Sequence, residues 1–321
     1  MNRPKVFISR QLPDSVMNRA DEKFDLTVRM RSDPMNSEDL RRCLEDYDGV
    51  VPTLGDALQA DVFVDPASIR CRILANFGAG YNHIDPEAAR RAGVAVTNTP
   101  GAVTEATADI ALALILMTAR RTAEGDRLVR RGEWTGWAPT AMLGAGVFGK
   151  TLGVIGMGRI GRAVAKRCHA GFDMKVVFFN RSKVPNPGVE ALQLESAAEV
   201  VRLADFVVVA VPGGPATHHM IDAELLSKMQ PRGILVNISR GDVVDEGALV
   251  EALQRKEIAG AGLDVYEHEP AVPDELVGME NVVLLPHLGT SVLEVREDMG
   301  MMALDNLTAF FAGETPPNLV N

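Results

Sequence analysis

Cysteine is scarce in this chain, and no C-x-x-C pair is present. The three cysteines, Cys43, Cys71 and Cys168, are an odd number and lie far apart, which argues against a disulfide framework. They are better interpreted as small apolar side chains that are buried in a protein kept reduced. This usage predicts a cytoplasmic protein.

Long apolar runs and an excess of positive charge are also lacking. The longest apolar run, residues 110–117, is far too short to cross a bilayer, and residues 1–10 have no apolar core of a signal peptide. The chain has 33 basic and 43 acidic side chains, and a formal charge of −10 repels nucleic-acid backbones. We therefore expect no membrane span and no nucleic-acid partner, while a local basic site could still bind an anionic substrate.

Short apolar runs alternate with amphipathic stretches along most of the chain. Strands are expected at 6–8, 26–28, 49–51, 73–75 and 94–97, and again at 152–155, 175–179, 206–211, 234–238, 262–265 and 282–285. In the second series helices are expected near 160–170, 197–203, 246–254 and 293–312. This alternation predicts an α/β fold with two Rossmann-like, doubly wound parallel-sheet domains and a cleft between them.

Between the two strand series, a long helix is expected at about 104–131. The irregular segment after it, residues 133–149, carries both tryptophans, Trp134 and Trp137. Such side chains need shelter, so we interpret this segment as an arm that packs on another surface, with a second subunit as one candidate. If the last helix packs back onto the first domain, that domain comprises 1–98 plus 290–321, and the dinucleotide-binding domain comprises 99–289.

A glycine-rich turn follows the first strand of the second series. The run Gly156-Met-Gly158-Arg159-Ile160-Gly161 fits the G-x-G-x-x-G pattern, with a strand before it and a helix after it. Gly156 would permit the tight turn, Gly158 the approach of a pyrophosphate, and Gly161 close packing of helix on strand. Backbone N–H groups at the helix N-terminus would hold the phosphates. This context favours a dinucleotide site over a turn that is glycine-rich by chance.

The end of the next strand bears on which dinucleotide binds. An NAD site usually has Asp or Glu about 20 residues beyond the glycines, but this strand ends in Asn180-Arg181-Ser182-Lys183. Arg181 offers a planar donor fork that suits a phosphate, with Ser182 and Lys183 beside it. We therefore predict that NADP(H) is preferred and NAD(H) is a second option. The alternative is that Arg181 is a solvated turn residue.

Polar residues follow three consecutive strands of the second series. Arg240 comes after 234–238, Glu269 after 262–265, and His287 after 282–285. Ligands bind at the carboxyl ends of strands in open α/β sheets, so these side chains are expected near the cofactor crevice. Alone, Arg240 could equally be a surface residue paired with Asp242 or Asp245, and His287 a structural turn residue. The grouping is what favours a site.

This set suits the reduction of a carbonyl group. A histidine can give a proton to the carbonyl oxygen, and a carboxylate on its other nitrogen fixes the tautomer and favours the imidazolium. A cation can hold the substrate and stabilise developing charge. Asp264, inside an apolar strand, needs a partner, which could be a nicotinamide carboxamide or a nearby backbone group. The remaining histidines show no metal-binding spacing and are interpreted as surface or packing residues: His83, His169, His218, His219 and His268.

Taken together, these motifs resemble the D-isomer-specific 2-hydroxyacid dehydrogenase family, and most of all its glyoxylate/hydroxypyruvate reductase branch. The likeness runs over nearly the whole chain. Its landmarks include Gly78-Ala79-Gly80-Tyr81, Thr97-Asn98-Thr99-Pro100, the glycine-rich turn, Asn237-Ile238-Ser239-Arg240 and Leu285-Pro286-His287.

The resemblance implies a reaction and a role for each residue. A small 2-keto acid such as glyoxylate or hydroxypyruvate would be reduced to the D-2-hydroxy acid by hydride transfer. His287 would be the general acid, Glu269 its partner, and Arg240 a substrate ligand. Backbone N–H groups of Ala79 and Gly80 would hold the substrate carboxylate. The other residues expected to line the substrate are Leu54 and Gly78, and those expected to line the cofactor are Thr107, Pro212, Ile238, Asp264, His287 and Gly289.

Family members are usually homodimers held by the long helix and the arm, so a homodimer is expected here. Two alternatives stay open. One is another 2-hydroxyacid dehydrogenase, of the D-lactate or phosphoglycerate type. The other is a corepressor-like protein that binds dinucleotide mainly as a signal, which very slow turnover and tight capture of a protein partner would reveal.

Overall fold

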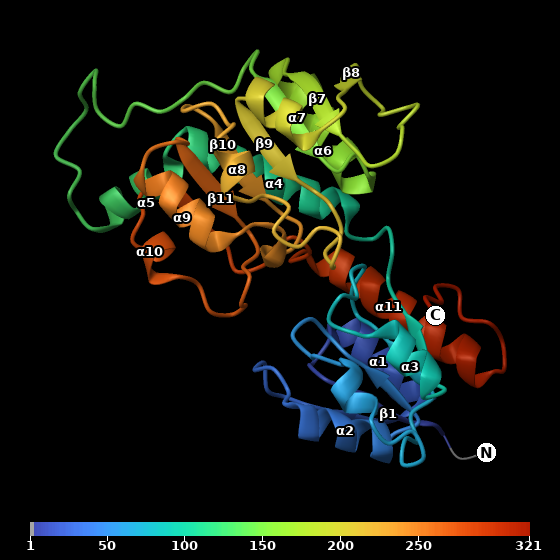
Figure 1. Cartoon of the computed structure of the whole chain (residues 1–321). Coiled ribbons are helices and arrows are strands. Elements are labelled where there is room, and N and C mark those ends of the chain that lie inside the picture. Colours follow the sequence, from blue (N-terminus) through green and yellow to red (C-terminus); the bar gives the residue numbers. More distant parts are fainter. Residues whose placement is uncertain (1–2) are drawn as a thin grey trace. The chain divides into compact units, whose positions relative to one another are not determined.

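The computed structural model describes residues 3–321, and the chain divides into two compact units (Figure 1). The first, here called the terminal unit, comprises Met1–Val103 and Thr290–Asn321. The second, the central unit, comprises Thr104–Gly289. Both ends of the chain therefore contribute to one unit, and the other is inserted between them.

Within the described residues, the terminal unit contains a five-stranded parallel sheet with the order β2-β1-β3-β4-β5. Its strands are β1 (Lys5–Ile8), β2 (Asp25–Val28), β3 (Gly49–Val51), β4 (Ile73–Ala75) and β5 (Ala95–Thr97). Its helices are α1 (Asp14–Lys23), α2 (Ser37–Asp46), the 3-10 helix η1 (Ala60–Phe63), α3 (Pro86–Arg91) and α11 (Leu293–Phe311).

Both faces of this sheet are covered, as the apolar strands require. Val6 and Ile8 pack in one cluster with residues of α1 and α11, whereas Phe7 between them packs in another with α2. The helices start at residues suited to that position. The Asn36 side chain accepts a hydrogen bond from the Asp39 N–H at the start of α2, and Asp85 caps α3 in the same way.

The central unit contains, among the described residues, a seven-stranded parallel sheet with the order β12-β11-β10-β9-β6-β7-β8. Its strands are β6 (Thr151–Ile155), β7 (Lys175–Phe179), β8 (Ala191–Gln193), β9 (Phe206–Val209), β10 (Ile234–Asn237), β11 (Gly260–Leu263) and β12 (Val282–Leu284). Its helices are α4 (Thr104–Ala119), α5 (Thr122–Arg130), α6 (Arg159–Phe172), α7 (Ala197–Leu203), α8 (Ala223–Leu226), η2 (Gly241–Val243), α9 (Glu246–Gln254) and α10 (Asp274–Val277).

Alternate residues of these strands face opposite layers of helices. On β9, Phe206 and Val208 pack with α4 and α6, while Val207 and Val209 pack with α7, α8 and α9. Close approach of α4 to the sheet depends on Gly262, because a Cβ there would lie 2.9 Å from the Leu114 side chain. The predicted α/β fold with two parallel sheets is thereby confirmed.

The expected single helix at 104–131 is wrong. α4 ends at Ala119 and α5 begins at Thr122, because Arg121 adopts the left-handed conformation with φ of 52°. That conformation interrupts a right-handed helix. The Arg121 guanidinium pairs with the Glu124 carboxylate at 2.6 Å, which fixes the start of α5. The short edge strand β8 was not predicted, because three residues of mixed polarity give no strand pattern.

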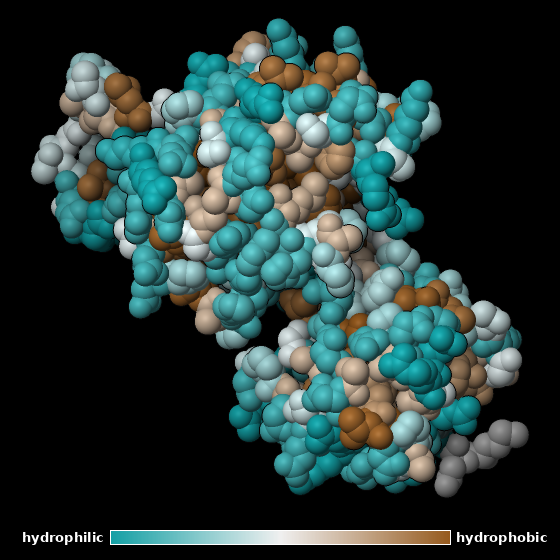
Figure 2. All heavy atoms as spheres, viewed as in Figure 1, coloured by the Kyte–Doolittle hydropathy of each residue, from teal (hydrophilic) through white to brown (hydrophobic). Residues whose placement is uncertain are grey.

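After α5 the chain forms an irregular arm, residues 131–150. Its outer part protrudes from the central unit as the green loop of Figure 1, and Val147 near its end packs in the core. Apolar side chains on it are exposed, including Trp134 at 61% and Trp137 at 83%, and Figure 2 shows brown hydrophobic atoms on the same protrusion. Single exposed apolar residues are ordinary, but here two tryptophans are exposed on the same arm. In the described part of the chain, no helix combines the length and apolarity needed to cross a membrane.

Candidate active site

The glycine-rich turn joins β6 to α6 at the carboxyl end of the central sheet. Gly156 has a φ of 100°, and a Cβ there would lie 2.6 Å from the Ala210 carbonyl oxygen. A Cβ at Gly161 would lie 2.2 Å from the Gly156 carbonyl oxygen. Neither position can carry a side chain, so both glycines are required for the turn and for the packing of α6 against β6.

Gly158 has a different environment. A Cβ added there would meet nothing within 4 Å, so its backbone faces open space. Arg159 and Ile160 open α6, and no side chain caps this helix N-terminus. Free backbone N–H groups at a helix N-terminus bind phosphate, and a glycine lets the phosphate come close. The residues present therefore fit a dinucleotide pyrophosphate.

The turn after β7 forms a small polar pocket. Asn180 Nδ2 donates to the carbonyl oxygen of Ser182 at 3.0 Å and to its hydroxyl at 3.2 Å, and Gln193 Nε2 donates to the Asn180 and Ser182 carbonyls. These bonds fix the turn around a pocket of about 410 Å³, lined by residues 179–183 and 193–195. Arg181 is exposed there and forms no hydrogen bond or ion pair with residues 3–321. Gln193, on the unpredicted strand β8, was not expected at this position.

The predicted proton donor and its partner lie side by side. His287 follows β12 and Glu269 follows the neighbouring strand β11, and His287 Nδ1 lies 2.9 Å from Glu269 Oε2 and 3.2 Å from Oε1. Glu269 Oε1 also accepts the Tyr266 N–H at 3.0 Å. Burial raises the pKa of Glu269, but the His287 hydrogen bond and charge, the Tyr266 N–H and the Arg240 charge outweigh it and hold that pKa below its ordinary value. With Nδ1 engaged, Nε2 is the nitrogen left for a substrate.

Arg240 follows β10, the strand next to β11. Its backbone carbonyl accepts a hydrogen bond from Asn237 Nδ2 at 2.9 Å, and its own Nη1 donates to the Ser239 carbonyl at 2.7 Å. The side chain is half-buried rather than spread over the surface. Burial lowers the pKa of Arg240, opposed by the charges of Glu269 and Asp242, and a guanidinium still stays charged at any working pH. Arg240, Glu269 and His287 thus lie on three neighbouring strand ends.

Asp264 holds the turn that carries His287. Its buried carboxylate accepts the Leu288 N–H at 2.6 Å and the Gly289 N–H at 2.8 Å, while its backbone carbonyl accepts the His287 N–H. His287 has a backbone φ of 54°, which residues other than glycine rarely adopt, so this turn depends on the hydrogen bonds to Asp264. Burial raises the pKa of Asp264 despite these bonds. The alternative expected for Asp264, a carboxylate that caps nearby backbone, describes what the structure shows.

The other residues expected along the cofactor also follow strand ends of this sheet or lie beside them. Thr107 Oγ1, on α4, donates to the Gly289 carbonyl at 3.1 Å, and a Cβ at Gly289 would meet both Thr107 and Asp264. Pro212 lies shortly after β9, and Ile238 directly after β10. Thr107, Asp264 and Gly289 therefore form one connected group beside His287.

Three residues that support this site were not identified from the sequence. The Tyr266 hydroxyl donates to the Leu285 carbonyl at 2.9 Å, which ties the loop after β11 to the end of β12. Glu246 is buried and accepts the Glu267 N–H at 3.0 Å. A Cβ at Gly241 would lie 1.7 Å from the Tyr266 carbonyl carbon, so only glycine fits beneath that peptide. The position of Gly241 directly after Arg240 was the one signal available.

In the terminal unit, the expected substrate residues lie on two loops at one edge of its sheet. Leu54 follows β3 and is partly exposed, and the loop Gly78-Ala79-Gly80 follows the neighbouring strand β4. A bridge between Thr53 and Phe77 joins the two loops. The carboxyl ends of these strands are where an open α/β sheet binds ligands.

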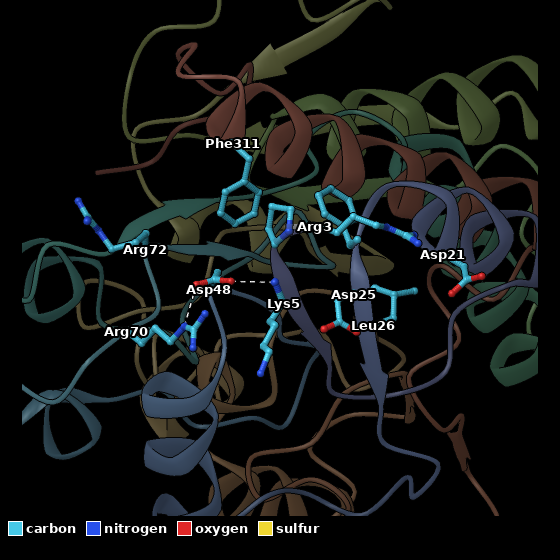
Figure 3. A pocket seen from close by; sticks show the side chains of 11 residues that line it. Arg3, Lys5, Asp21, Asp25, Leu26, Asp48, Arg70, Arg72 and Phe311 are labelled. Carbon is cyan, nitrogen blue, oxygen red and sulfur yellow. Dashed lines mark hydrogen bonds and ion pairs between the residues drawn. The ribbon is translucent and has the colours of Figure 1, made fainter. Parts of the chain in front are cut away.

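A second depression, of about 660 Å³, lies at the opposite edge of the same sheet, where its strands begin (Figure 3). The Asp48 carboxylate there accepts the Lys5 N–H and Arg70 Nε, each at 2.8 Å. In Figure 3 the side chains of Lys5 and Arg72 point in different directions. These cations do not converge on a common anion, so we assign no ligand to this depression.

His218, His219 and Glu267 bring potential metal-ligand atoms within 4.8 Å of one another. The two imidazole rings are stacked, with centroids 4.0 Å apart and planes inclined by 26°. His219 Nε2 lies 2.8 Å from Glu267 Oε1, and this hydrogen bond is the main cause that raises the pKa of His219. The group fits a His–Glu pair that ties two loops together.

A doubly wound parallel sheet with a glycine-rich β6–α6 turn, and with an imidazole, a carboxylate and a guanidinium on neighbouring strand ends, defines a nucleotide-dependent dehydrogenase. The model of the family described as D-isomer specific 2-hydroxyacid dehydrogenase, NAD binding domain, matches residues 112–289, more than half of the chain. The chain belongs to the D-isomer specific 2-hydroxyacid dehydrogenase family and is an NAD(P)-dependent 2-hydroxyacid dehydrogenase.

Several relatives align with this chain over nearly the whole length of both proteins. The glyoxylate reductase of Pyrococcus furiosus is 44% identical over 99% of this chain and 96% of its own length. That of Thermococcus kodakarensis is 45% identical with the same coverage. The structure of the NADPH-dependent glyoxylate/hydroxypyruvate reductase of Sinorhizobium meliloti, in complex with NADP and malonate, matches with a TM-score of 0.87 and 33% identity, covering 99% of this chain and 97% of that one. The predicted family is thereby confirmed.

Proposed function

We propose that this enzyme reduces a small 2-keto acid, glyoxylate or hydroxypyruvate, to the D-2-hydroxy acid and prefers NADPH. The observation that carries the proposal is the His287–Glu269 pair beside Arg240, on strand ends of the sheet that also carries the glycine-rich turn. The full-length likeness to archaeal glyoxylate reductases supports the choice of substrate.

The reduced nicotinamide, when bound, supplies the hydride that goes to the carbonyl carbon. His287 gives the proton from Nε2 to the carbonyl oxygen, so that the product is a neutral alcohol, and takes a proton back from solvent. Glu269 fixes the proton on Nδ1 and stabilises the imidazolium. Arg240 carries a fixed positive charge for the substrate carboxylate and for the charge that develops on the carbonyl oxygen.

The turn after β7 supports the preference for NADPH. Arg181 is exposed beside a pocket built by Asn180, Ser182 and Gln193, and no carboxylate stands where an NAD site usually places one. A guanidinium can bind a 2′-phosphate through two parallel hydrogen bonds. The related enzyme from Sinorhizobium meliloti is described as NADPH-dependent.

We further propose a homodimer in the cytoplasm. The exposed tryptophans of the arm give a surface that a second copy of the chain can cover. The three cysteines are buried and unpaired, which suits a reducing compartment.

Initial rates test the proposal. Purified enzyme is given NADPH and NADH in turn, with glyoxylate, hydroxypyruvate, pyruvate and 2-ketobutyrate. The highest kcat/KM should be found with glyoxylate or hydroxypyruvate and NADPH. A preference for a bulkier 2-keto acid or for NADH would contradict the proposed substrate or cofactor and would indicate another branch of the family. No turnover with any pair, together with capture of a protein partner, would favour a dinucleotide-sensing role.

A further inference from the structure

The loop after β4 is held by two asparagine side chains. Asn76 Nδ2 donates to the carbonyl oxygens of Gly78 at 3.0 Å and Gly80 at 3.1 Å. Asn98 Nδ2 donates to the carbonyl oxygen of Ala79, between them, at 2.8 Å. All three consecutive carbonyls of the loop are therefore engaged by side-chain amides.

The engaged carbonyls also fix the directions of the loop's N–H groups. A trans peptide is planar, and its C=O and N–H bonds point in opposite directions. Holding the Gly78 carbonyl therefore points the Ala79 N–H the other way, and holding the Ala79 carbonyl does the same for the Gly80 N–H. Within residues 3–321, neither of these N–H groups donates to a protein acceptor. Neighbouring backbone N–H groups that have no protein acceptor are suited to bind an anion.

Asn76 depends in turn on His83. An asparagine amide can fill its space in two orientations, and the wrong one would set Oδ1 against two carbonyl oxygens. His83 Nε2 lies 3.0 Å from Asn76 Oδ1. Because both hydrogens of Asn76 Nδ2 are used on the carbonyls, Oδ1 must accept, and His83 Nε2 must carry the hydrogen. Asn76 is fully buried, so this arrangement is not exchanged for water.

We propose that Asn76, His83 and Asn98 are positioning residues that hold the Ala79 and Gly80 N–H groups in place, and thereby set the affinity for the carboxylate of the substrate. None of the three needs to touch the substrate. They hold the loop in order before the substrate binds, so that binding does not carry the entropic cost of ordering it. This inference rests on the proposed function, the reduction of a 2-keto acid, together with the expectation that these N–H groups and Arg240 share the substrate carboxylate.

The variants are chosen to break single hydrogen bonds. Asn76→Asp keeps the shape but places an oxygen against the Gly78 and Gly80 carbonyls. His83→Leu removes the donor to Asn76 Oδ1, and His83→Gln supplies another N–H in its place. Asn98→Ala releases the Ala79 carbonyl. Thermal unfolding checks that each variant folds, and the pair His83→Leu and His83→Gln carries the test if Asn76→Asp does not.

Two readouts separate positioning from general damage. The first is the binding of oxamate, a carboxylate that is not reduced, to the enzyme–NADP⁺ complex by calorimetry. The second is the division of the kinetic effect between KM and kcat for glyoxylate. Asn76→Asp and His83→Leu should weaken oxamate and raise KM on the order of 10- to 100-fold, the range for a lost buried hydrogen-bond partner. NADPH affinity should stay within about twofold, since the cofactor residues lie in the central unit, and His83→Gln should recover most of the loss.

The outcomes distinguish this inference from the proposed function. If wild-type enzyme binds oxamate but reduces neither glyoxylate nor hydroxypyruvate, the proposed function fails and the comparison of oxamate affinities still decides the inference. If His83→Leu binds oxamate as tightly as wild type, or His83→Gln as weakly as His83→Leu, the positioning role is wrong. Failure of folded wild type to bind oxamate at all would also overturn it.

Discussion

Glutamine at position 269 would remove the negative charge beside His287 and leave the side chain's size unchanged. The Glu269 carboxylate contacts His287 Nδ1 through both oxygens, at 2.9 and 3.2 Å, and Oε1 also accepts the Tyr266 N–H. In Glu269→Gln the amide oxygen can keep the bond to Tyr266, but the amide nitrogen then faces the Nδ1 hydrogen. The protonated His287 ring therefore loses the negative charge that stabilises it, while the neutral ring loses much less.

The size of this effect follows from the geometry. A hydrogen bond between charged groups contributes about 1.5–3 kcal/mol, and each tenfold change in rate corresponds to about 1.4 kcal/mol. The side chains of His287 and Glu269 are 25% and 28% exposed, so solvent screens part of the interaction and the lower half of that range applies. The value of kcat/KM for glyoxylate should therefore fall roughly 10- to 40-fold in Glu269→Gln.

The assay is kcat/KM for glyoxylate from pH 5 to pH 10 with NADPH. Glu267→Gln is a matched control, because it removes a carboxylate on the same loop as Glu269 that lies 2.8 Å from a different histidine, His219. The control should keep the wild-type kcat/KM, and Glu269→Gln should lose it as stated above. Equal profiles for wild type and Glu269→Gln would show that this carboxylate does not tune the acid.

The same pair contributes to stability in a defined direction. The pKa of Glu269 in the folded protein lies below its ordinary value, so its contribution is present above about pH 4 and is lost as pH falls through the folded pKa. The free energies of unfolding of wild type and Glu269→Gln should differ near neutral pH and converge at acid pH. A difference that does not change with pH would mean that packing, and not charge, separates the two proteins.

Three further changes test other parts of the account. Gly158→Ala should leave the melting temperature unchanged, because a Cβ there meets no protein atom. It should weaken the affinity for NADPH at least tenfold, because that Cβ would lie where the pyrophosphate must approach. Gly171→Ala, equally open on α6, is the control and should bind NADPH as the wild type does. Arg181→Asp should lower the NADPH-to-NADH ratio of kcat/KM by roughly 100-fold through loss of a charged contact and gain of repulsion, and an unchanged ratio would show that Arg181 does not read the cofactor. For the proposed homodimer, replacing Trp134 and Trp137 with serine should give monomers in sedimentation, and an unchanged mass would show that the arm does not form the interface.

Features that depend on local patterns could be predicted from the sequence. Most strands of the two sheets are continuous apolar runs, because they are buried on two faces, and all except β8 were located to within a few residues. The positions of Arg240, Glu269 and His287 after consecutive strands were enough to place them on one edge of a parallel sheet. The pairing distance and the choice of Nδ1 required coordinates.

Features that depend on a single backbone conformation or on distant contacts could not be predicted. Nothing in the apolar pattern of residues 104–131 shows that Arg121 adopts a left-handed conformation and ends α4. The contacts of Asn76 could not be predicted because two of its partners are backbone carbonyls, which carry no residue identity. His83 was interpreted as a surface or packing residue, since one histidine without metal-binding spacing gives no signal of its own.

The most direct test of the account is the rate of hydride transfer in His287→Ala, measured by stopped flow with saturating NADPH and glyoxylate. Loss of the proton donor should lower the rate roughly 10²- to 10⁴-fold while NADPH affinity changes little. His268→Ala, an exposed histidine of the loop after β11, serves as the control and should keep the wild-type rate. A His287→Ala enzyme that transfers hydride at nearly the wild-type rate would contradict the assignment of His287 as the acid.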